Sequence, residues 1–438
     1  MKNIVLLLSC VAMLGSLAQA SSQPNVVIIV SDDMGWNDVG YHGSKVQTPN
    51  IERLAAEGMK LERFYVHPVC SPTRTAMMTG RSPARFGITN PLGGDRGVPL
   101  DEHFMSSALQ AAGYQTFAIG KWHLGAVGDE YSPLRRGFDH FYGFRNGFID
   151  YYAHTFEAEL DWQRDGVALK EEGYSTDLLA AEAVRVIEKR DRVKPMFLYL
   201  PFNAPHDPVQ APEELIEKYR SLGGRDRSNI YAAAIDAMDQ GIGRVLAALE
   251  KEGMTKNTLV LFFCDNGAKS VSAVQGEGGL ALRGSKGSLL EGGVRVPAVL
   301  RWPDVITPGS RCEQMISALD LLPTLTAAVG IPHGSEKPLD GVNVWPAIRA
   351  NKVMPRSPLV IAGSRGQFAV LDDSLKLIIG ADGAELYHVR NDPTESHNLA
   401  EAQAADVARL KTAAESIMTA VPRGKGKAKA GKGKKNSN

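Results

Sequence analysis

A thiol, a proline and a guanidinium stand at alternate positions of one short segment, as Cys70, Pro72 and Arg74. Pro72 fits the first turn of a helix, where its missing N–H costs nothing, and Gly80 would end that helix. The spacing predicts that Cys70 lies just ahead of the helix, beside unpaired N–H groups that stabilise anions. Arg74, one turn further in, would point back toward the thiol. A buried structural cysteine is the alternative interpretation.

Two pairs of oxygen-bearing side chains, Asp32-Asp33 and Asp265-Asn266, each follow an apolar run. Three carboxylates and one amide oxygen form a hard donor set, which favours Ca²⁺ or Mg²⁺ over zinc. No group of histidines and cysteines has the spacing of a zinc site. Taken alone, each pair also fits a helix cap or a turn.

Four further groups, Lys121, His123, His206 and Lys286, are cationic or can be protonated. Lys121 and His123 end an apolar segment, where such groups are costly unless they meet an anion. Lys286 lies in residues 283–297, whose several glycines suit a tight loop around a ligand. A snorkelling lysine and a packed histidine are the alternative for these positions.

The segments between these groups predict alternating strands and helices. Continuous apolar runs at 25–31, 114–119, 196–200 and 259–263 are typical of strands buried on both faces of a parallel sheet. Helices are expected at 48–56, 105–112, 177–190 and 231–252. The pattern predicts an α/β fold, a large mostly parallel sheet flanked by helices. Its polar clusters would converge at the carboxyl ends of the strands.

The C-terminal part differs in texture. Short strands are expected at 367–371, 375–380 and 385–389 and a helix at 401–419, which predicts a small antiparallel sheet packed by a helix. We therefore divide the chain into a main domain at 21–354 and a small α+β subdomain at 355–421. Residues 422–438 form a basic Gly/Lys tail too poor in apolar groups to fold, unless an anionic polymer or cell surface binds it.

Residues 1–20 have the pattern of a signal peptide, with Lys2, an apolar stretch and the cleavage motif Ala18-Gln19-Ala20. The stretch is too short to span a membrane, and a lipoprotein signal at Cys10 is a weaker alternative. We expect export to the periplasm or medium, no transmembrane segment and no nucleic-acid partner. Whether Cys264 and Cys312 pair is left open.

These motifs together resemble those of the type I sulfatases, the formylglycine-dependent arylsulfatase family of the alkaline-phosphatase-like superfamily. The Cys70–Arg74 segment is similar to the first family signature, with Thr73 where serine is commonest. Residues 121–125 and 283–297 resemble two further family motifs. Other family-like stretches are 48–51, 136–143, 385–387, 391–393 and 398–399.

The resemblance implies an alkaline-phosphatase-like fold and oxidation of Cys70 to formylglycine by dedicated maturation machinery. The aldehyde hydrate is the nucleophile in that family. It also implies one bound Ca²⁺, with Mg²⁺ as an alternative. The implied metal ligands are Asp32, Asp33, Asp265, Asn266 and modified Cys70.

The family's chemistry supplies roles for the remaining groups. Hydrolysis of a sulfate monoester needs an in-line nucleophile, cations on the non-bridging oxygens and an acid for the leaving group. By resemblance, Arg74 and Lys121 position the hydrate, which attacks sulfur with help from Ca²⁺ and Asp265. Lys286 and His206 hold the sulfate, and one of them protonates the departing alcohol. His123 then takes a proton from the second hydroxyl, which expels sulfate.

The implied function is a sulfuric ester hydrolase, an arylsulfatase-type enzyme acting on a sulfated small molecule or glycan. Mixed aromatic and polar groups in residues 144–163 suit a sugar platform or an ordinary surface loop; they are Arg145, Asp150, Tyr151, Tyr152, His154 and Trp162. Two alternatives stay open: a phosphoester or phosphonate monoester hydrolase of the same superfamily, and a non-catalytic glycan-binding relative. The natural substrate and the oligomeric state are left open.

Overall fold

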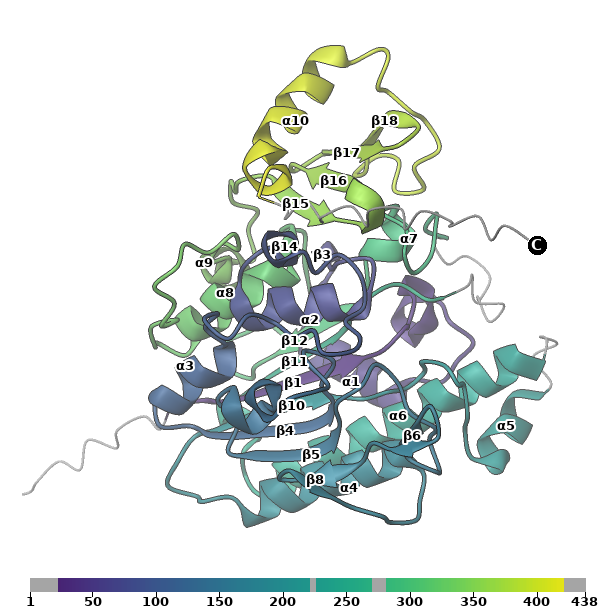
Figure 1. Cartoon of the computed structure of the whole chain (residues 1–438), viewed down its shortest axis with the longest axis vertical. Helices are drawn as coiled ribbons and strands as arrows, with labels where there is room; N and C mark the ends of the chain where they lie inside the picture. The colour runs from purple at the N-terminus through teal and green to yellow at the C-terminus, as the bar shows by residue number, and fades with distance from the viewer. Residues whose placement is uncertain (1–22, 221–225, 270–280, 421–438) are drawn as a thin grey trace, which may run out of the picture.

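A computed structural model describes residues 23–220, 226–269 and 281–420 (Figure 1). The predicted apolar runs form the centre of its large sheet. The strands are β1 (Asn25–Ser31), β2 (Met59–Leu61), β4 (Gln115–Lys121), β5 (His140–Phe144), β8 (Gln163–Arg164), β9 (Val167–Ala168), β10 (Met196–Pro201), β11 (Thr258–Cys264), β12 (Ala298–Arg301) and β13 (Ser310–Cys312). Their order in this 10-stranded sheet is β13-β2-β12-β11-β1-β10-β4-β5-β8-β9.

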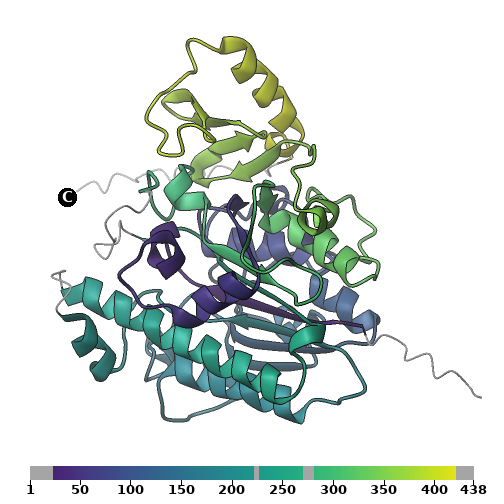
Figure 2. The same ribbon diagram turned by 180° about the vertical axis from the view of Figure 1, so that it is seen from behind.

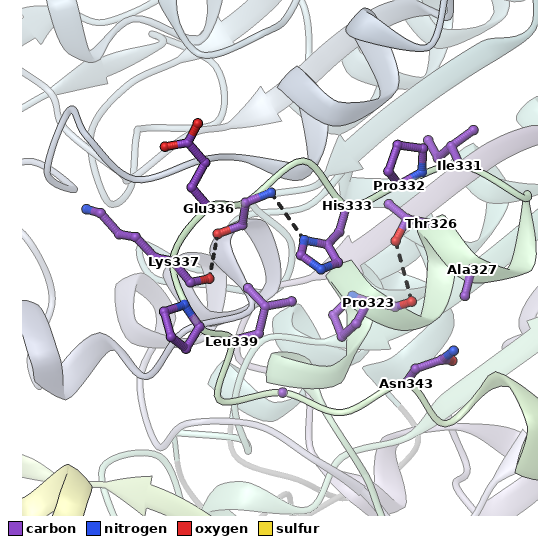
Figure 3. A pocket seen from close by; sticks show the side chains of 13 residues that line it. Pro323, Thr326, Ala327, Ile331, Pro332, His333, Glu336, Lys337, Leu339 and Asn343 are labelled. Carbon is purple, nitrogen blue, oxygen red and sulfur yellow. Dashed lines mark hydrogen bonds between the residues drawn. The ribbon is translucent and has the colours of Figure 1, made fainter.

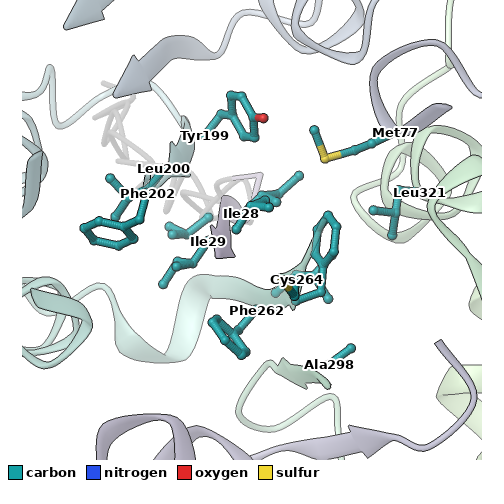
Figure 4. Packing of buried hydrophobic residues seen from close by; sticks show 14 of the residues in the cluster. Ile28, Ile29, Met77, Tyr199, Leu200, Phe202, Phe262, Cys264, Ala298 and Leu321 are labelled. Carbon is teal, nitrogen blue, oxygen red and sulfur yellow. The ribbon is translucent and has the colours of Figure 1, made fainter. Parts of the chain in front are cut away.

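The five central strands β11, β1, β10, β4 and β5 are all parallel. The sequence predicts four of them and a mostly parallel sheet; β5 is the strand that it missed. Every residue of β1 is buried, because helices cover both faces of the sheet. In register, Val26 of β1 pairs with Phe197 of β10 and with Leu259 of β11. Figure 4 shows the apolar side chains of these strands packed around Ile28 and Ile29. The strands beyond β11 and β5 include antiparallel pairs, so the sheet is mixed at its edges.

The helices lie on the two faces of the sheet. Helices α2, α3 and α8 cover the face turned toward the viewer in Figure 1, and α1, α4 and α6 cover the face seen in Figure 2. The predicted helices are confirmed, with ends shifted by a few residues. Their bounds are α1 (Pro49–Glu57), α2 (Cys70–Thr79), α3 (Met105–Ala111), α4 (Ser175–Lys189), α5 (Glu213–Tyr219), α6 (Asp226–Lys251), α7 (Glu291–Val294), α8 (Leu321–Ala328), α9 (Trp345–Ala350) and α10 (Ala404–Met418).

Helix α2 begins one residue earlier than the sequence predicts. Cys70 is its first residue, not the residue before it, and Val69 is the extended N-cap. Pro72 lies in the first turn, as expected, so its missing N–H removes no helical hydrogen bond. Gly80 ends the helix in the left-handed conformation and donates its N–H to the carbonyl of Ala76 at 2.8 Å.

Strand β4 runs two residues past its predicted end and includes Lys121. Gly120 allows this, because its φ is +127° and a Cβ would lie 1.9 Å from the carbonyl oxygen of Pro201. Only glycine accepts both conditions without displacing the neighbouring strand β10. The extension carries the lysine to the edge of the sheet where the polar clusters meet.

The C-terminal residues form the predicted antiparallel sheet with a helix against it. Its strands are β15 (Leu359–Ala362), β16 (Phe368–Leu371), β17 (Leu375–Gly380) and β18 (Gly383–His388), and α10 packs on them around a second, smaller apolar core. Short strands β3 (Phe64–Tyr65) and β14 (Ile316–Ser317) pair with each other, as do β6 (Thr155–Phe156) and β7 (Glu159–Leu160). The division at residue 355 stays a prediction.

The expected signal peptide at 1–20 and the basic tail at 422–438 lie outside the described residues. Among the residues described, no helix combines the length and the apolar character that crossing a membrane requires. Cys264 and Cys312 are free, buried thiols, which settles the open question of their pairing. Their strands β11 and β13 are separated in the sheet by β12 and β2.

Candidate active site

The site lies at the carboxyl edge of four adjacent parallel strands. Asp32 and Asp33 follow β1, Lys121 ends β4 and His206 follows β10. The fourth strand, β11, is followed by Asp265 and Asn266, and Cys70 and Arg74 reach the same edge from α2. Contacts given below join eight of the ten predicted site residues, and Cys70 and His123 form a pair within reach of the charge of Lys121, so the structure brings the predicted residues to one edge of the sheet.

Arg74 is the buried centre of the cluster. Its Nε and Nη2 both donate to Oδ2 of Asp265, at 3.0 and 2.8 Å. Its Nη1 donates to the carbonyl of Lys121 at 3.0 Å and to the hydroxyl of Tyr199 at 3.1 Å. The guanidinium therefore ties together the ends of β4, β10 and β11. The sequence predicts that Arg74 points toward the thiol, but its hydrogen bonds in the described structure go to Asp265, Lys121 and Tyr199. Tyr199 is a partner that the sequence did not indicate.

Two lysines bind the paired aspartates. Lys121 Nζ lies 2.5 Å from Oδ2 of Asp32, and both side chains are fully buried. Lys286 Nζ lies 2.5 Å from Oδ1 of Asp33. Buried charges are stable only when paired in this way.

Four buried oxygen atoms of the cluster are left without a hydrogen-bond partner in the described part of the chain. They are Oδ1 of Asp32, Oδ2 of Asp33, Oδ1 of Asp265 and Oδ1 of Asn266. Each belongs to a side chain whose other polar atom is bonded; the amide of Asn266, for example, donates to Oδ1 of Asp33 at 2.8 Å. Buried polar atoms are nearly always satisfied, so four unpartnered oxygens gathered at one place fit a site for a cation. Carboxylate and amide oxygens are the donor set of Ca²⁺ or Mg²⁺.

The electrostatics of the carboxylates agree with this interpretation. Burial, followed by the charge of Asp32, raises the pKa of Asp265 to about 6. Burial has the same tendency at Asp33, but His206 and Lys286 outweigh it and lower the pKa of that carboxyl. A divalent cation between the carboxylates would offset the repulsion that burdens Asp265. Ligand atoms of Asp32, Asp33 and His206 all lie within 4.8 Å of one another, so the histidine borders the same space.

Cys70 faces a neutral histidine. Its Sγ lies 3.2 Å from Nδ1 of His123, whose Nε2 lies 2.9 Å from the carbonyl of Leu92. Because a carbonyl only accepts, Nε2 carries the proton and Nδ1 is the acceptor that faces the thiol. Burial and the charge of Lys121 hold the pKa of His123 well below its usual value. The ring is held from one side by Gly147, where a Cβ would lie 2.7 Å from its Cε1.

His206 stands at the outer side of the cluster. Its Nε2 lies 3.7 Å from Oδ2 of Asp33, and its Nδ1 donates to the carbonyl of Asp207 at 2.6 Å. Burial and the charge of Lys121 lower the pKa of His206 to about 4. The hydroxyl of Tyr151 donates toward the carbonyls of Asn203 and His206, which fixes the turn after β10.

A cavity of about 620 Å³ opens beside His206. Its walls are Phe148, His206, Asp207, Pro208, Val209 and Lys269. The ring of Phe148 stacks on that of His206, with centroids 6.2 Å apart and planes at 9°. The cavity therefore continues the polar cluster outward along an aromatic surface.

The sequence indicated the correct segment for an aromatic surface, but most of the aromatic groups it named lie inside. Tyr151, His154 and Trp162 are buried among core side chains and form neither a sugar platform nor a surface loop, whereas Tyr152 is 46% exposed. Phe148 lines the cavity instead. No sequence signal separates Phe148 from Phe144, which points into the core, because both stand in the same aromatic-rich stretch.

A second cavity, of about 590 Å³, lies between α8 and the loop that follows it (Figure 3). Pro323, His333 and Leu339 are among its lining residues, and the loop is held by a hydrogen bond from Ser335 N to Nδ1 of His333 at 3.2 Å. It contains none of the predicted site residues. We therefore place the candidate active site at the polar cluster and not in this second cavity.

Comparison with known proteins identifies the family. The family model described as Sulfatase matches residues 24–331, which include every residue of the polar cluster. This chain belongs to the sulfatase family of enzymes. The alkaline-phosphatase-like fold implied by the motifs agrees with the mixed, mostly parallel sheet described above.

Similar proteins include two named as sulfatases and one solved structure with a bound oligosaccharide. Mouse N-acetylgalactosamine-6-sulfatase is 35% identical over 382 residues, covering 81% of this chain and 71% of that protein. Mouse arylsulfatase J is 34% identical over 348 residues, covering 77% of this chain but only 57% of its own length. The crystal structure of Ps i-CgsB in complex with k-i-k-neocarrahexaose has a TM-score of 0.86 and 34% identity. It covers 91% of this chain and 94% of that chain.

Proposed function

We propose that this chain is a sulfuric ester hydrolase that cleaves sulfate monoesters with a formylglycine made from Cys70 and a bound Ca²⁺. The observation that carries the proposal is the set of four unpartnered buried oxygens beside a thiol and three cationic side chains. Family membership and the names of the relatives support it. We also propose that residues 1–20 direct export, to the periplasm or the medium.

Asp32, Asp33, Asp265 and Asn266 would hold the cation through their free oxygens, and modified Cys70 would complete the ligand set. The donor set fits Ca²⁺, with Mg²⁺ as the alternative. When present, the cation and the formylglycine supply positive charge and an oxygen nucleophile. The side chains of this protein would bind the sulfate and move the protons.

Two lysines and one histidine would receive the sulfate. Lys121 is fully buried against Asp32 and Lys286 is mostly buried against Asp33. The pKa of Lys286 is raised because, against the opposing effect of burial, Asp33 stabilises its charge. Such groups neutralise the non-bridging oxygens without reorganising solvent. His206 would complete this set, and Arg74 would keep Asp265 and Lys121 in place through its hydrogen bonds.

Two histidines would move the protons. His123 is neutral and its Nδ1 faces the atom attached to Cβ of Cys70, so it can accept a proton there. His206 has a pKa of about 4 in the free site. A bound sulfate would raise that pKa, because an anion stabilises the imidazolium, and would make His206 a proton donor to the leaving alcohol. Lys286 is the alternative donor.

The alcohol part of the substrate would occupy the cavity beside His206. Its volume of about 620 Å³ and the ring of Phe148 suit a sugar residue, since pyranose rings pack on aromatic faces. We therefore propose a sulfated glycan as substrate, and small aryl sulfates as surrogates. The oligosaccharide bound by Ps i-CgsB is consistent with this class.

Mass spectrometry of the tryptic peptide 64–74 tests the nucleophile. The modified peptide would be lighter than the thiol form by the mass of hydrogen sulfide less one oxygen. The peptide that contains Cys264, a buried thiol outside α2, is the internal control and should stay unmodified. Cys70→Ala should abolish turnover.

Turnover of p-nitrophenyl sulfate and p-nitrophenyl phosphate by the modified, calcium-loaded protein tests the reaction. Faster hydrolysis of the phosphate would favour the phosphoester or phosphonate monoester hydrolase. Modified protein that hydrolyses neither ester but binds a sulfated glycan would be the non-catalytic relative. Substantial turnover by Cys70→Ala would contradict the proposed nucleophile.

A further inference from the structure

Three charged side chains are buried together where the C-terminal sheet meets the main domain. Lys376 of β17 is 0% exposed, and its Nζ lies 3.0 Å from Oε1 of Glu291 and 2.9 Å from Oε1 of Glu395. Glu395 also accepts the backbone N–H of Glu291 at 2.7 Å. Tyr65 donates to the second oxygen of Glu291 at 3.1 Å, and Arg295 lies 3.4 Å from it. We call Lys376, Glu291 and Glu395 the buried charge cluster.

Burying such a cluster costs desolvation that its ion pairs barely recover, so apolar side chains of similar volume would stabilise the fold as well or better. Directional contacts are what apolar side chains cannot supply. The cluster therefore points to a need to fix the relative positions of the segments that it joins. The cluster lies next to the loop that carries Lys286, so that loop is the segment whose geometry it can fix.

Glu291 is the first residue of α7 and ends the loop that carries Lys286. This loop contacts both halves of the site. The N–H of Lys286 donates to the carbonyl of Ala268, two residues after Asn266, at 2.8 Å. The N–H of Gly287 donates to the carbonyl of Pro68, two residues before Cys70, also at 2.8 Å. A shift of the loop would thus move Lys286 relative to Asp33.

The beginning of the same loop is held by the same C-terminal elements. Arg283 donates from Nη1 to the carbonyl of Glu395 at 2.8 Å and to the hydroxyl of Tyr387 at 3.1 Å. Glu395 therefore binds the loop at both ends, through Arg283 and through the N–H of Glu291. Figure 1 shows α7 directly below the C-terminal sheet, between it and the main domain.

We propose that Lys376 and Glu395 are positioning residues, through which the C-terminal sheet holds the loop that places Lys286 on Asp33. The inference rests on the proposed function for its link to turnover, but its structural part does not. The C-terminal sheet is then a component of the active site, although none of its residues contacts the polar cluster in the described structure.

Lys376→Met is the direct test, because it keeps the length of the side chain and removes its charge. We expect kcat/KM for a sulfate ester to fall about tenfold to a hundredfold in the folded protein. Hydrogen exchange of the amides of 283–294 should accelerate at least about tenfold. Leu377→Ala is the matched control, since Leu377 is the next residue of β17, fully buried in the small core and outside the cluster. It should destabilise the sheet but change neither readout.

The double variant Lys376→Met/Glu395→Gln separates positioning from stability. It removes one charge of each sign, so thermal stability should partly recover while kcat/KM and loop exchange stay impaired. If the Lys376→Met protein does not fold, the double variant is measured in its place. Recovery of both readouts with stability, or a Lys376→Met protein indistinguishable from Leu377→Ala, would overturn the inference. If the wild type hydrolyses no sulfate ester, the proposed function fails, and loop exchange alone still decides the positioning role.

Discussion

Removal of calcium should change how the stability of this protein depends on pH. Without a cation, burial and Asp32 raise the pKa of Asp265 from 3.8 to about 6 in the folded state. A folded-state pKa above the unfolded value means that the folded protein binds the proton more tightly. The free energy of unfolding of the chelated protein therefore falls as pH rises from about 4 to about 6, by about 3 kcal/mol in total.

Bound calcium reverses this contribution, because its charge favours the ionised carboxylate. Each pH unit below about 6 should weaken calcium binding about tenfold, since Asp265 must lose its proton to act as a ligand. Saturating calcium at about 1,000 times its Kd stabilises a protein by about 4 kcal/mol. That stabilisation should be smaller by about 1.4 kcal/mol at about pH 5 than at about pH 7.

The assay is thermal unfolding at both pH values. The protein is freed of metal by dialysis against a chelator at neutral pH and then measured with and without added calcium. Burial raises the pKa of Asp239 to about 6 as well, but this residue belongs to α6, and its carboxylate accepts the N–H groups of Asn50 and Ile51 at the start of α1. Its contribution is the same with and without calcium, so the difference between the two samples isolates Asp265. An equal increase in Tm at both pH values, or no increase, would refute the metal assignment.

Three further predictions concern single side chains. Gly147→Ala should lower kcat at least about tenfold with little loss of binding, because its Cβ would lie 2.7 Å from the ring of His123; Gly93→Ala, whose Cβ meets nothing within 4 Å, is the control, and steady-state kinetics decide. Phe148→Ala should raise KM for a sulfated oligosaccharide about tenfold and leave KM for p-nitrophenyl sulfate within about twofold, as initial rates on the two substrates will show. Burial opposes ionisation of Glu182, but neighbouring arginines and a histidine lower its pKa to about 2. The ionised carboxylate therefore stabilises the fold above about pH 4.5, and this stabilisation is lost as pH falls toward about 2. Glu182→Gln should cost about 1–2 kcal/mol at neutral pH, allowing for solvent screening of its exposed partners, and flatten this acid limb in urea titrations.

Each of these has a contradicting outcome. Equal kinetics of the two glycine variants would mean that the ring of His123 needs no support. A uniform rise in KM for both substrates of Phe148→Ala would assign that ring to the sulfate and not to the sugar. An unchanged acid limb in Glu182→Gln would mean that its ion pairs contribute nothing to folding.

Strands and chemical residue types were predictable because local sequence encodes them. Strands β1, β10 and β11 are buried at every position and mostly apolar, which is typical of strands covered on both faces. The errors also have local causes. The start of α2 depends on the extended conformation of Val69, and the end of β4 depends on contact between Gly120 and Pro201, which no periodicity reveals.

The sequence by itself determined the family, the parallel sheet and the ten polar residues of the site, since motifs and hydrophobic runs are properties of neighbouring residues. Only the tertiary structure decided how those residues pair: that the two oxygen-bearing pairs are each bonded through one polar atom per side chain and keep one oxygen without a partner, that Phe148 lines the cavity, and that Lys376 reaches Glu291. These contacts join residues far apart in the chain. Their geometry follows from how the two cores pack together, and packing is a property of the whole fold.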